Sequence, residues 1–235
     1  MQKEGAAQYP KEACGLIIKR GKKTVAIPCE NISTEPEEHF LMSPESYAEA
    51  ADKGEVIGVW HTHPDKSSKP SEADLAGCEA SELVWVIMGV VQDENGGFRY
   101  EKPEAIEPAG FELPYLERPY VFGVVDCYTL VQDYYKREYG IKLIEAPRVE
   151  EWWLQGHNFV EDLFEEIGFI RVKDAPQKGD IFLMQIGADV ANHMAIYMGD
   201  DTVLHHCHGR LSTRDIYGGY WQKHTTFHLR YKDFV

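Results

Sequence analysis

Two histidines separated by one residue, followed by a serine and an aspartate, form the first group of residues that could do chemistry. His61 and His63 end a hydrophobic run that starts at Val56, and Ser71 and Asp74 follow after a polar loop. The two-residue period of a strand points both imidazoles to the same side. A helix that starts at Ser71 puts Ser71 and Asp74 on one face. Two imidazoles and one carboxylate, with a fourth position for water, are the ligand set of a catalytic zinc.

A catalytic zinc also needs a group that moves protons, and Glu12 is the candidate because it opens a predicted strand. In that hypothesis Ser71 donates to the developing oxyanion. Each residue has a simpler interpretation when it is taken alone. Ser71 could only cap its helix, Glu12 could be a solvated carboxylate at a strand end, and an isolated His-x-His pair is a weak indication of metal binding. The joint pattern is far more specific than its members.

A second group of reactive residues lies in the other half of the chain. Cys127 starts a predicted helix, where the macrodipole and free N–H groups favour a thiolate. His193 begins one predicted strand and His205 lies on the next, so antiparallel pairing would bring the two rings side by side. Nucleophile, base and orienting group are the parts of a thiol peptidase. Taken singly, Cys127 could be a small buried hydrophobic residue and each histidine a structural one.

The run His205-His206-Cys207-His208 leaves the third position of this group open. His206 could replace His205, although strand alternation favours His205. The run could alternatively bind a metal. In the peptidase interpretation Cys207 is a bystander thiol.

The segments that must position the first group alternate between strands and helices. This pattern predicts an α/β sandwich for residues 1–102. The elements expected there are a hairpin over 13–18 and 24–28, a helix over 44–51, a strand ending at residue 61, a helix from residue 71, a strand over 83–88 and a turn at 95–97 that leads into 98–100.

A proline-rich stretch with little periodicity follows, and it predicts an inter-domain linker over residues 103–117. The rest of the chain, residues 118–235, predicts an α+β domain in which helices precede a small antiparallel sheet. The expected helices cover 126–139 and 158–167, and the expected strands cover 181–184, 193–198, 203–206 and 225–231.

The composition excludes several classes of function. A formal net charge of −15 over 235 residues argues against a phosphate-tracking nucleic-acid surface. No apolar run approaches the ~18 residues of a membrane span. The N-terminus has no apolar core of a signal peptide. Five cysteines without any CxxC spacing indicate reduced thiols made in a cytoplasm.

The first group resembles the JAMM (MPN-type) metalloproteases, whose signature is a glutamate upstream of H-x-H-x7-S-x2-D. The matching residues are Glu12 within YPKEACGLI and the segment HTHPDKSSKPSEAD. The resemblance implies one zinc ion held by His61, His63 and Asp74, with Glu12 as acid/base and Ser71 as oxyanion helper. It also implies a cytidine-deaminase-like mixed sheet with flanking helices, and cleavage of isopeptide or C-terminal peptide bonds.

The second group resembles the NlpC-type, papain-related cell-wall endopeptidases. The matching pieces are RPYVFGVVDCYTLVQDYY, QKGDIFLM, HMAIYMGDD and TVLHH. The resemblance implies a papain-like α+β domain with Cys127 as nucleophile, His193 as base and His205 as the third residue. It implies that Tyr120 helps to hold the substrate, which would be the stem peptides of peptidoglycan.

The order of the two domains resembles the K-type tail assembly proteins of phages with long, non-contractile tails. This resemblance implies tail tip proteins as partners, and a location in the host cytoplasm during assembly or at the tail tip of the virion. Two alternatives stay open. The chain could be a structural tail tip assembly factor whose catalytic sites are dispensable or process only phage proteins. It could also be a bacterial housekeeping wall hydrolase, which the absence of a signal peptide disfavours.

Overall fold

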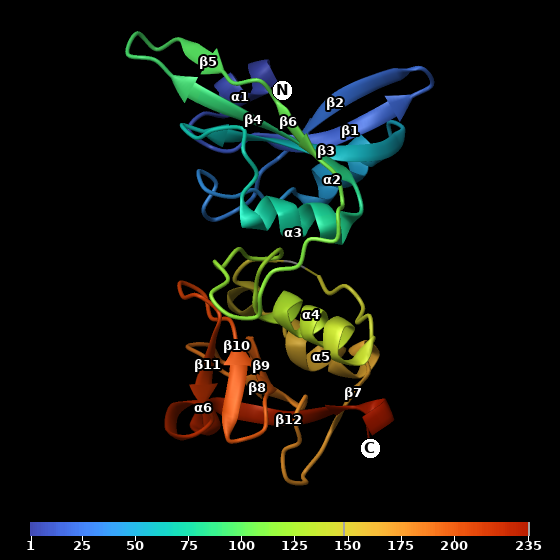
Figure 1. Cartoon of the computed structure of the whole chain (residues 1–235), viewed down its shortest axis with the longest axis vertical. Coiled ribbons are helices and arrows are strands. Elements are labelled where there is room, and N and C mark those ends of the chain that lie inside the picture. Colours follow the sequence, from blue (N-terminus) through green and yellow to red (C-terminus); the bar gives the residue numbers. More distant parts are fainter. Residues whose placement is uncertain (148, 235) are drawn as a thin grey trace. The chain divides into compact units, whose positions relative to one another are not determined.

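The chain divides into two compact units, each with a sheet of its own (Figure 1). Unit 1 comprises Met1–Glu112 and unit 2 comprises Leu113–Val235. The coordinates are a computed structural model that describes residues 1–147 and 149–234. In these ranges, no helix combines the length and the apolar character needed to cross a membrane.

Unit 1 is built on a mixed sheet in which β3 and β4 run parallel and the other pairs are antiparallel. Its strands follow the order β2-β1-β3-β4-β5, and β6 also pairs with β4. The strands are β1 (Cys14–Arg20), β2 (Lys23–Cys29), β3 (Glu55–Pro64), β4 (Val84–Gln92), β5 (Phe98–Tyr100) and β6 (Glu104–Ile106). The helices are α1 (Gln2–Gln8), α2 (Pro44–Ala51) and α3 (Glu72–Ser81).

Helices cover both faces of this sheet. One face carries the apolar cluster that α2 and α3 complete, formed by Leu16, Ile18, Ala50, Val59, Cys78 and Trp85. On the other face α1 approaches so closely that a Cβ at Gly5 would lie 3.1 Å from Thr62 and 3.0 Å from Val90. Because successive strand residues point to opposite faces, His61 and His63 lie on the α3 side and Thr62 on the α1 side.

The strand that carries the histidines is longer than the sequence predicts. The expected strand ends at His61, whereas β3 continues to Pro64 because its parallel pairing with β4 extends to Pro64 and Val90. On the other edge, Thr62 N donates to Ala13 O, and Thr62 Oγ1 accepts from Ala13 N. Neighbours on both sides therefore fix the backbone of the His-x-His segment.

Part of the stretch predicted as a linker, residues 103–117, belongs to the sheet of unit 1. Its residues Glu104–Ile106 form β6, which pairs with the β4 residues Trp85 to Ile87. Leu113, with 4% of its surface exposed, is also buried. A three-residue strand has too little periodicity to be seen between prolines, and its partner strand decides its conformation.

Unit 2 contains a fully antiparallel sheet with the strand order β11-β10-β9-β8-β12-β7. Its strands are β7 (Phe169–Arg171), β8 (Ile181–Met184), β9 (His193–Tyr197), β10 (Thr202–His205), β11 (Thr213–Ile216) and β12 (Thr225–Tyr231). Its helices are α4 (Cys127–Tyr139), α5 (Phe159–Ile167), α6 (Gly219–His224) and the 3-10 turns η1 (Trp152–Gln155) and η2 (Lys232–Phe234). The short elements β7, β11 and α6 are absent from the sequence prediction.

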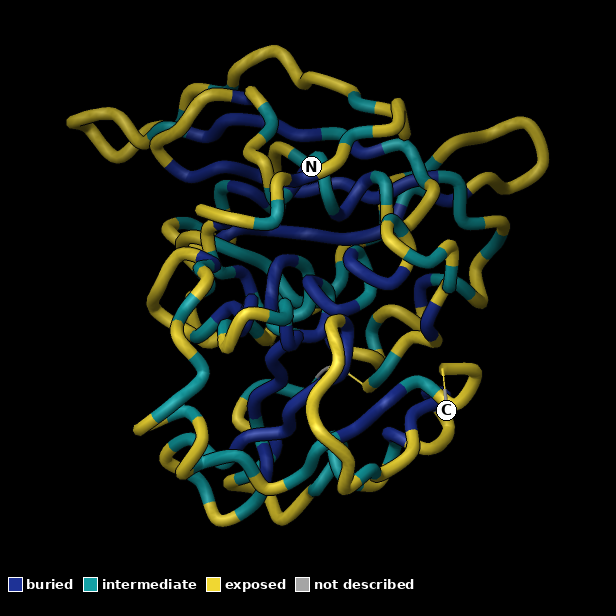
Figure 2. The backbone as a smooth tube through the Cα atoms, turned by 60° about the horizontal axis from the view of Figure 1, so that its bottom comes forward, coloured by how far each residue is buried: buried dark blue, intermediate teal, exposed yellow. Residues whose placement is uncertain are grey.

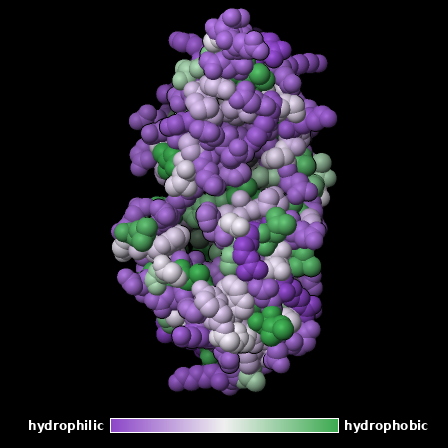
Figure 3. Space-filling model, turned by 90° about the vertical axis from the view of Figure 1, so that its left-hand side faces the viewer, coloured by the Kyte–Doolittle hydropathy of each residue, from purple (hydrophilic) through white to green (hydrophobic). Residues whose placement is uncertain are grey.

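Alternation along the strands of unit 2 produces two apolar layers. Residues such as Leu183, Met194 and Leu204 pack under α4 and α5, while Phe182 and Val203 face the opposite side, where Trp221 of α6 covers them. Figure 2 shows the resulting pattern in both units, with buried backbone along central strands and exposed backbone at hairpin turns. The face drawn in Figure 3 is mostly hydrophilic, as the charge content predicts.

Candidate active sites

In unit 1, β3 and α3 bring two imidazoles and one carboxylate to a common point. His61 Nε2 lies 3.0 Å from His63 Nε2. Asp74 Oδ1 lies 3.1 Å from His61 Nε2, and Asp74 Oδ2 lies 3.3 Å from His63 Nε2. All three side chains are buried. The structure thus assembles the three residues that the sequence nominates as metal ligands.

A backbone contact orients the ring of His63. His63 Nδ1 lies 2.9 Å from the carbonyl oxygen of Ser67. A carbonyl only accepts hydrogen bonds, so Nδ1 carries a hydrogen, and in the neutral ring the lone pair of Nε2 faces the other two groups. Burial lowers the pKa of His61, although Asp74 opposes this shift. Neutral imidazole is the form that binds a metal.

Asp74 is held as a carboxylate at the third residue of α3. Burial disfavours its charge, but the contacts with His61 and His63 outweigh burial and hold the pKa of Asp74 below its usual range. Oδ2 also accepts from Ser71 N at 2.7 Å and from Ser71 Oγ at 2.8 Å. The first turn of the helix therefore orients this carboxylate.

The three groups fit a zinc ion. A tetrahedral zinc with bonds of about 2.0–2.1 Å keeps two nitrogen ligands about 3.3–3.4 Å apart. The two imidazole nitrogens are 3.0 Å apart, and each faces its own oxygen of Asp74, with Oδ1 3.1 Å from His61 and Oδ2 3.3 Å from His63, so these separations lie close to that range. The donor set of two neutral imidazoles and one carboxylate also leaves a fourth position for water or substrate. The second nitrogen of one ligand lacks the hydrogen-bond partner that usually supports a metal-bound histidine: the buried Nδ1 of His61 has none among the described residues.

Ser71 makes the contacts of a helix cap. Its Oγ accepts from Asp74 N at 3.1 Å, and Asp74 returns the contact in a capping box. The single hydroxyl hydrogen of Ser71 is donated to Asp74. An oxyanion role would require this hydrogen to turn toward the substrate, so that role stays a prediction.

Glu12 lies on the same side of the sheet as the histidines. Cys14 pairs with His61, and the two-residue period carries this side to Glu12, two positions earlier. Glu12 is 4% exposed. Burial, followed by the negative charge of Asp74, raises its pKa to about 9. A bound cation would favour the ionised form instead, so Glu12 can hold or release a proton beside the site.

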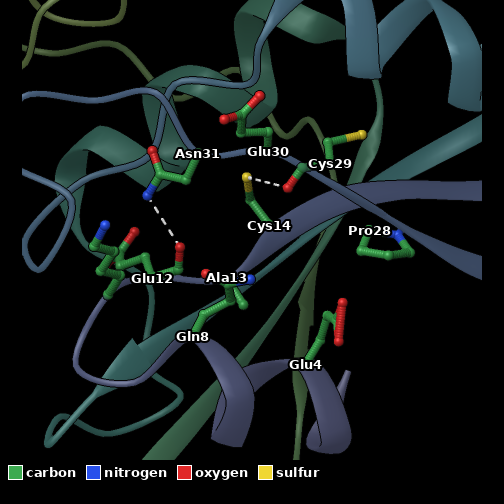
Figure 4. A pocket seen from close by; sticks show the side chains of 10 residues that line it. Glu4, Gln8, Glu12, Ala13, Cys14, Pro28, Cys29, Glu30 and Asn31 are labelled. Atoms are coloured by element: carbon green, nitrogen blue, oxygen red, sulfur yellow. Dashed lines mark hydrogen bonds between the residues drawn. The ribbon is translucent and has the colours of Figure 1, made fainter.

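The loop after β2 fixes the backbone at this glutamate. Asn31 Nδ2 donates to Glu12 O at 3.0 Å (Figure 4). The same nitrogen donates to His39 O at 3.1 Å. Figure 4 also shows a hollow between α1, β1 and β2 that includes Glu12. That hollow includes none of the three nominated ligands and is therefore a separate feature from the metal-ligand cluster.

In unit 2, three side chains form a chain of contacts that begins at His193. His193 Nε2 lies 3.0 Å from His205 Nδ1. His205 Nε2 lies 3.2 Å from Asp215 Oδ2, and Arg210 Nη2 lies 3.5 Å from the same oxygen. Sequence reasoning missed Asp215 because it lies on β11, a four-residue edge strand without a hydrophobic pattern. Only its pairing with β10 brings it to His205.

Asp215 determines which nitrogens carry hydrogen. A carboxylate accepts, so His205 Nε2 is the donor and His205 Nδ1 keeps its lone pair. His193 Nε2 must then donate to His205, which leaves the lone pair of His193 on Nδ1. Burial, followed by the neighbouring His205 and His206, lowers the pKa of His193 to about 3. This histidine is therefore neutral and can accept a proton at Nδ1.

Cys127 is the first residue of α4, the helix that packs against β9. The N-cap residue Asp126 accepts from the backbone N–H groups of Tyr128 at 3.0 Å and Thr129 at 2.9 Å. Its carboxylate offsets part of the positive end of the helix. His193 is the first residue of β9.

The ring of His206 faces away from the His193 contacts. It packs edge-on against Tyr120 at 5.1 Å, and His208 lies 5.2 Å from the same tyrosine ring. Tyr120, the predicted substrate-holding residue, is half-buried. Cys207 points the other way, with Sγ 3.7 Å from His193 Nε2 and 3.6 Å from His205 Nδ1.

Comparison with known proteins identifies the family of the chain. The chain is 43% identical to the tail tip assembly protein K of Escherichia phage N15, over 97% of this chain and 91% of that protein. The chain belongs to the tail tip assembly protein K family. The protein of the same name from Escherichia phage lambda is 36% identical, over 78% of this chain and 86% of its own length.

The two halves of this family member match two domain families. Residues 1–101 match the prokaryotic homologs of the JAB domain, and residues 117–230 match the NlpC/P60 family. The expected recognition of both halves is thereby confirmed. A solution structure from Desulfitobacterium hafniense shares 22% identity over 43% of this chain and 83% of its own, with a TM-score of 0.32, which is too low to compare folds.

Proposed function

We propose that this tail tip assembly protein is a thiol endopeptidase that cuts the peptide stems of peptidoglycan. The observation that carries the proposal is the chain of contacts from Asp215 through His205 to His193, beside a helix that begins with Cys127. In this proposal it works with other tail tip proteins, in the host cytoplasm during assembly and at the virion tail tip.

The mechanism uses the atom of His193 that the contacts leave available. Nε2 is engaged with His205, so Nδ1 must reach Cys127 Sγ. The thiol proton passes to Nδ1, and the thiolate attacks the carbonyl carbon of the stem peptide bond. The proton on Nδ1 then goes to the leaving amine, which gives an acyl-enzyme. Water attacks the thioester while His193 takes its proton, and the thiol is restored.

His205 and Asp215 act as positioning residues in this scheme. They keep the base in one tautomer and stabilise the imidazolium that forms after proton transfer. Tyr120, which flanks the same loop through His206 and His208, is proposed to hold the substrate.

For unit 1 we propose a zinc-dependent peptidase or isopeptidase activity. His61, His63 and Asp74 would hold the ion, which when bound supplies an acidified water and polarises a carbonyl. Glu12 would accept the proton of that water and pass it to the leaving amine. Ser71 keeps Asp74 in place and is proposed to donate to the oxyanion once its hydroxyl hydrogen is released.

Incubation with purified muropeptides tests the thiol site. Removal of a catalytic nucleophile costs up to about 10⁶-fold in rate, so we expect Cys127→Ala to release no stem fragments above background. Cys29→Ala, at a half-buried cysteine of unit 1 that forms no disulfide, should release the same fragments as the unsubstituted chain. Equal product from Cys127→Ala would reject the thiol mechanism. If neither unit cleaves any substrate, the chain acts in assembly alone.

Metal analysis tests the zinc site separately. All samples carry Cys207→Ser, because the thiol of Cys207 lies near His193 and His205 and could bind zinc in unit 2. In this background we expect one zinc per chain, which is retained in Glu12→Gln and lost in Asp74→Asn. Glu12 is not a ligand in this proposal, so loss of zinc from Glu12→Gln would contradict its role as a proton carrier.

A further inference from the structure

Cys207 completes a triangle of potential ligand atoms around the end of β10. Its Sγ lies 3.7 Å from His193 Nε2 and 3.6 Å from His205 Nδ1, and these two nitrogens are 3.0 Å apart. The peptidase mechanism uses the contact between the histidines but has no use for the thiol. The convergence of a third donor on the same point therefore needs a separate explanation.

The dimensions of the triangle match those of a zinc site. A tetrahedral zinc with a Zn–S bond of about 2.3 Å and Zn–N bonds of about 2.0–2.1 Å keeps sulfur about 3.5–3.6 Å from each nitrogen. The observed sulfur–nitrogen separations of 3.6 and 3.7 Å agree closely, and the two nitrogens would have to part by only a few tenths of an ångström. Both histidines are buried and Cys207 is half-buried.

The surroundings also orient the ligands as a metal requires. Asp215 holds the hydrogen of His205 on Nε2, so the lone pair of Nδ1 points at the centre of the triangle. Trp221 packs edge-on against His205 at 4.4 Å and restricts rotation of that ring. A carboxylate behind a ligating histidine is a common support of metal sites.

We propose that His193, His205 and Cys207 form a second metal site, which binds zinc or another thiophilic divalent cation and switches off the thiol peptidase of unit 2. The binding stands on the geometry alone. The inhibitory consequence rests on the proposed function, because it requires that His193 is the base.

Proton balance explains why an occupied site is inactive. Coordination by His193 Nε2 displaces the hydrogen that this atom donates to His205, and the neutral ring then carries it on Nδ1. The nitrogen that should accept the proton of Cys127 has become an N–H group, so the base is blocked. Cys207 binds as thiolate, and one proton leaves to solvent for each cation bound.

Cobalt(II) titration of the full chain distinguishes this site from the one in unit 1. The ligands His61, His63 and Asp74 contain no sulfur, so only a cysteine site can give a thiolate-to-cobalt charge-transfer band. We expect this band in the unsubstituted chain, in Asp74→Asn and in Cys29→Ser. We expect its loss in Cys207→Ser and in a second variant, Cys207→Ala. A band that persists in both Cys207 variants, or no band in the unsubstituted chain, would overturn the site.

Zinc titration of muropeptide cleavage tests the switch, with each variant normalised to its own rate in chelator. We expect at least about tenfold inhibition of the unsubstituted chain, reversed by chelator, and a zinc midpoint at least about tenfold higher in Cys207→Ser. A cobalt band without inhibition would overturn the switch while the metal site stands. No cleavage even in chelator would reject the proposed peptidase, and the cobalt band would still decide the site.

Discussion

Two histidine pairs, one in each unit, have the same nitrogen–nitrogen distance but different neighbours. In both pairs the facing nitrogens are 3.0 Å apart and the rings are buried. In unit 1 a carbonyl oxygen holds the hydrogen of His63 away from its partner, and Asp74 faces both rings. In unit 2 a carboxylate lies behind His205, which makes His193 a donor to it and leaves a basic nitrogen on the far side.

The difference shows that the distance between two imidazoles does not determine what they do. The acceptor behind each ring selects the tautomer, and on this basis we propose that the unit 1 pair binds a metal and the unit 2 pair relays a proton. Cys207 makes the unit 2 pair ambiguous, since one added ligand converts a relay into a metal site. Substitutions of Asp215 and Ser71 test this comparison, and a substitution of Asp180 tests the stability of the unit that carries the second pair.

The largest effect is expected from Asp215→Asn. An amide can turn its NH₂ toward His205 Nε2, which reverses both tautomers and leaves an N–H of His193 facing Cys127. The analogous change in serine peptidases costs about 10⁴-fold, so we expect kcat for muropeptides to fall by about 10²–10⁴-fold with KM nearly unchanged.

Asp200→Asn is the matched control for that substitution. Asp200 pairs with Arg214 on the same edge strand, and its side chain is exposed. If Asp215→Asn raised KM without lowering kcat, or if both variants lowered kcat equally, Asp215 would have only a structural role.

The next largest effect concerns the stability of unit 2. Asp180 is buried and accepts from Arg230 at 2.8 and 2.9 Å, while His228 lies 2.7 Å away. Removing one partner of such a buried pair costs about 3–5 kcal/mol. We expect Asp180→Asn to lower the free energy of unfolding of unit 2 by about this amount. Hydrogen exchange should become faster in β8 and β12 but not in the strands of unit 1.

Lowering the pH should destabilise unit 2 as Asp180→Asn does, because protonation removes the charge of Asp180. Burial opposes the charge of Asp180, but the contacts with Arg230, Gln177 N and His228 prevail and lower its pKa. A lowered pKa stabilises the fold above the unfolded value of about 3.9, and that stability is lost as pH falls through the folded pKa. Asp174→Asn, at an exposed carboxylate 3.9 Å from Arg230, should change stability by less than about 0.5 kcal/mol.

The smallest effect separates the two interpretations of Ser71. Ser71→Ala removes a cap worth about 1 kcal/mol and also releases Asp74, so we expect zinc affinity to fall by about tenfold. Ser43 caps α2 with the same 3.1 Å contact and has no part in the metal-ligand cluster. Ser43→Ala should therefore cost a similar stability without a change in zinc affinity. Equal zinc affinity in Ser71→Ala would show that Asp74 does not need this support.

Much of the fold could be predicted because its long elements carry their own signals. The apolar run that becomes β3, the proline-led α2 and the amphipathic α4 all form at or near their predicted positions. The short elements β6, β7, β11 and α6 were missed, because segments of three to six residues depend on a partner strand or layer for their conformation.

By itself the sequence determined the reactive residue types and their spacing. Strand alternation alone puts His61 and His63 on one side of β3, and a helix start alone puts Ser71 against Asp74. Only the tertiary structure decided what lies behind each ring. Asp215 comes from an edge strand that gave no signal, and Cys207 reaches the histidines only because β9 and β10 pair. Tautomers depend on such non-local neighbours, so sequence spacing could nominate both sites but could not assign the tautomers on which their proposed roles depend.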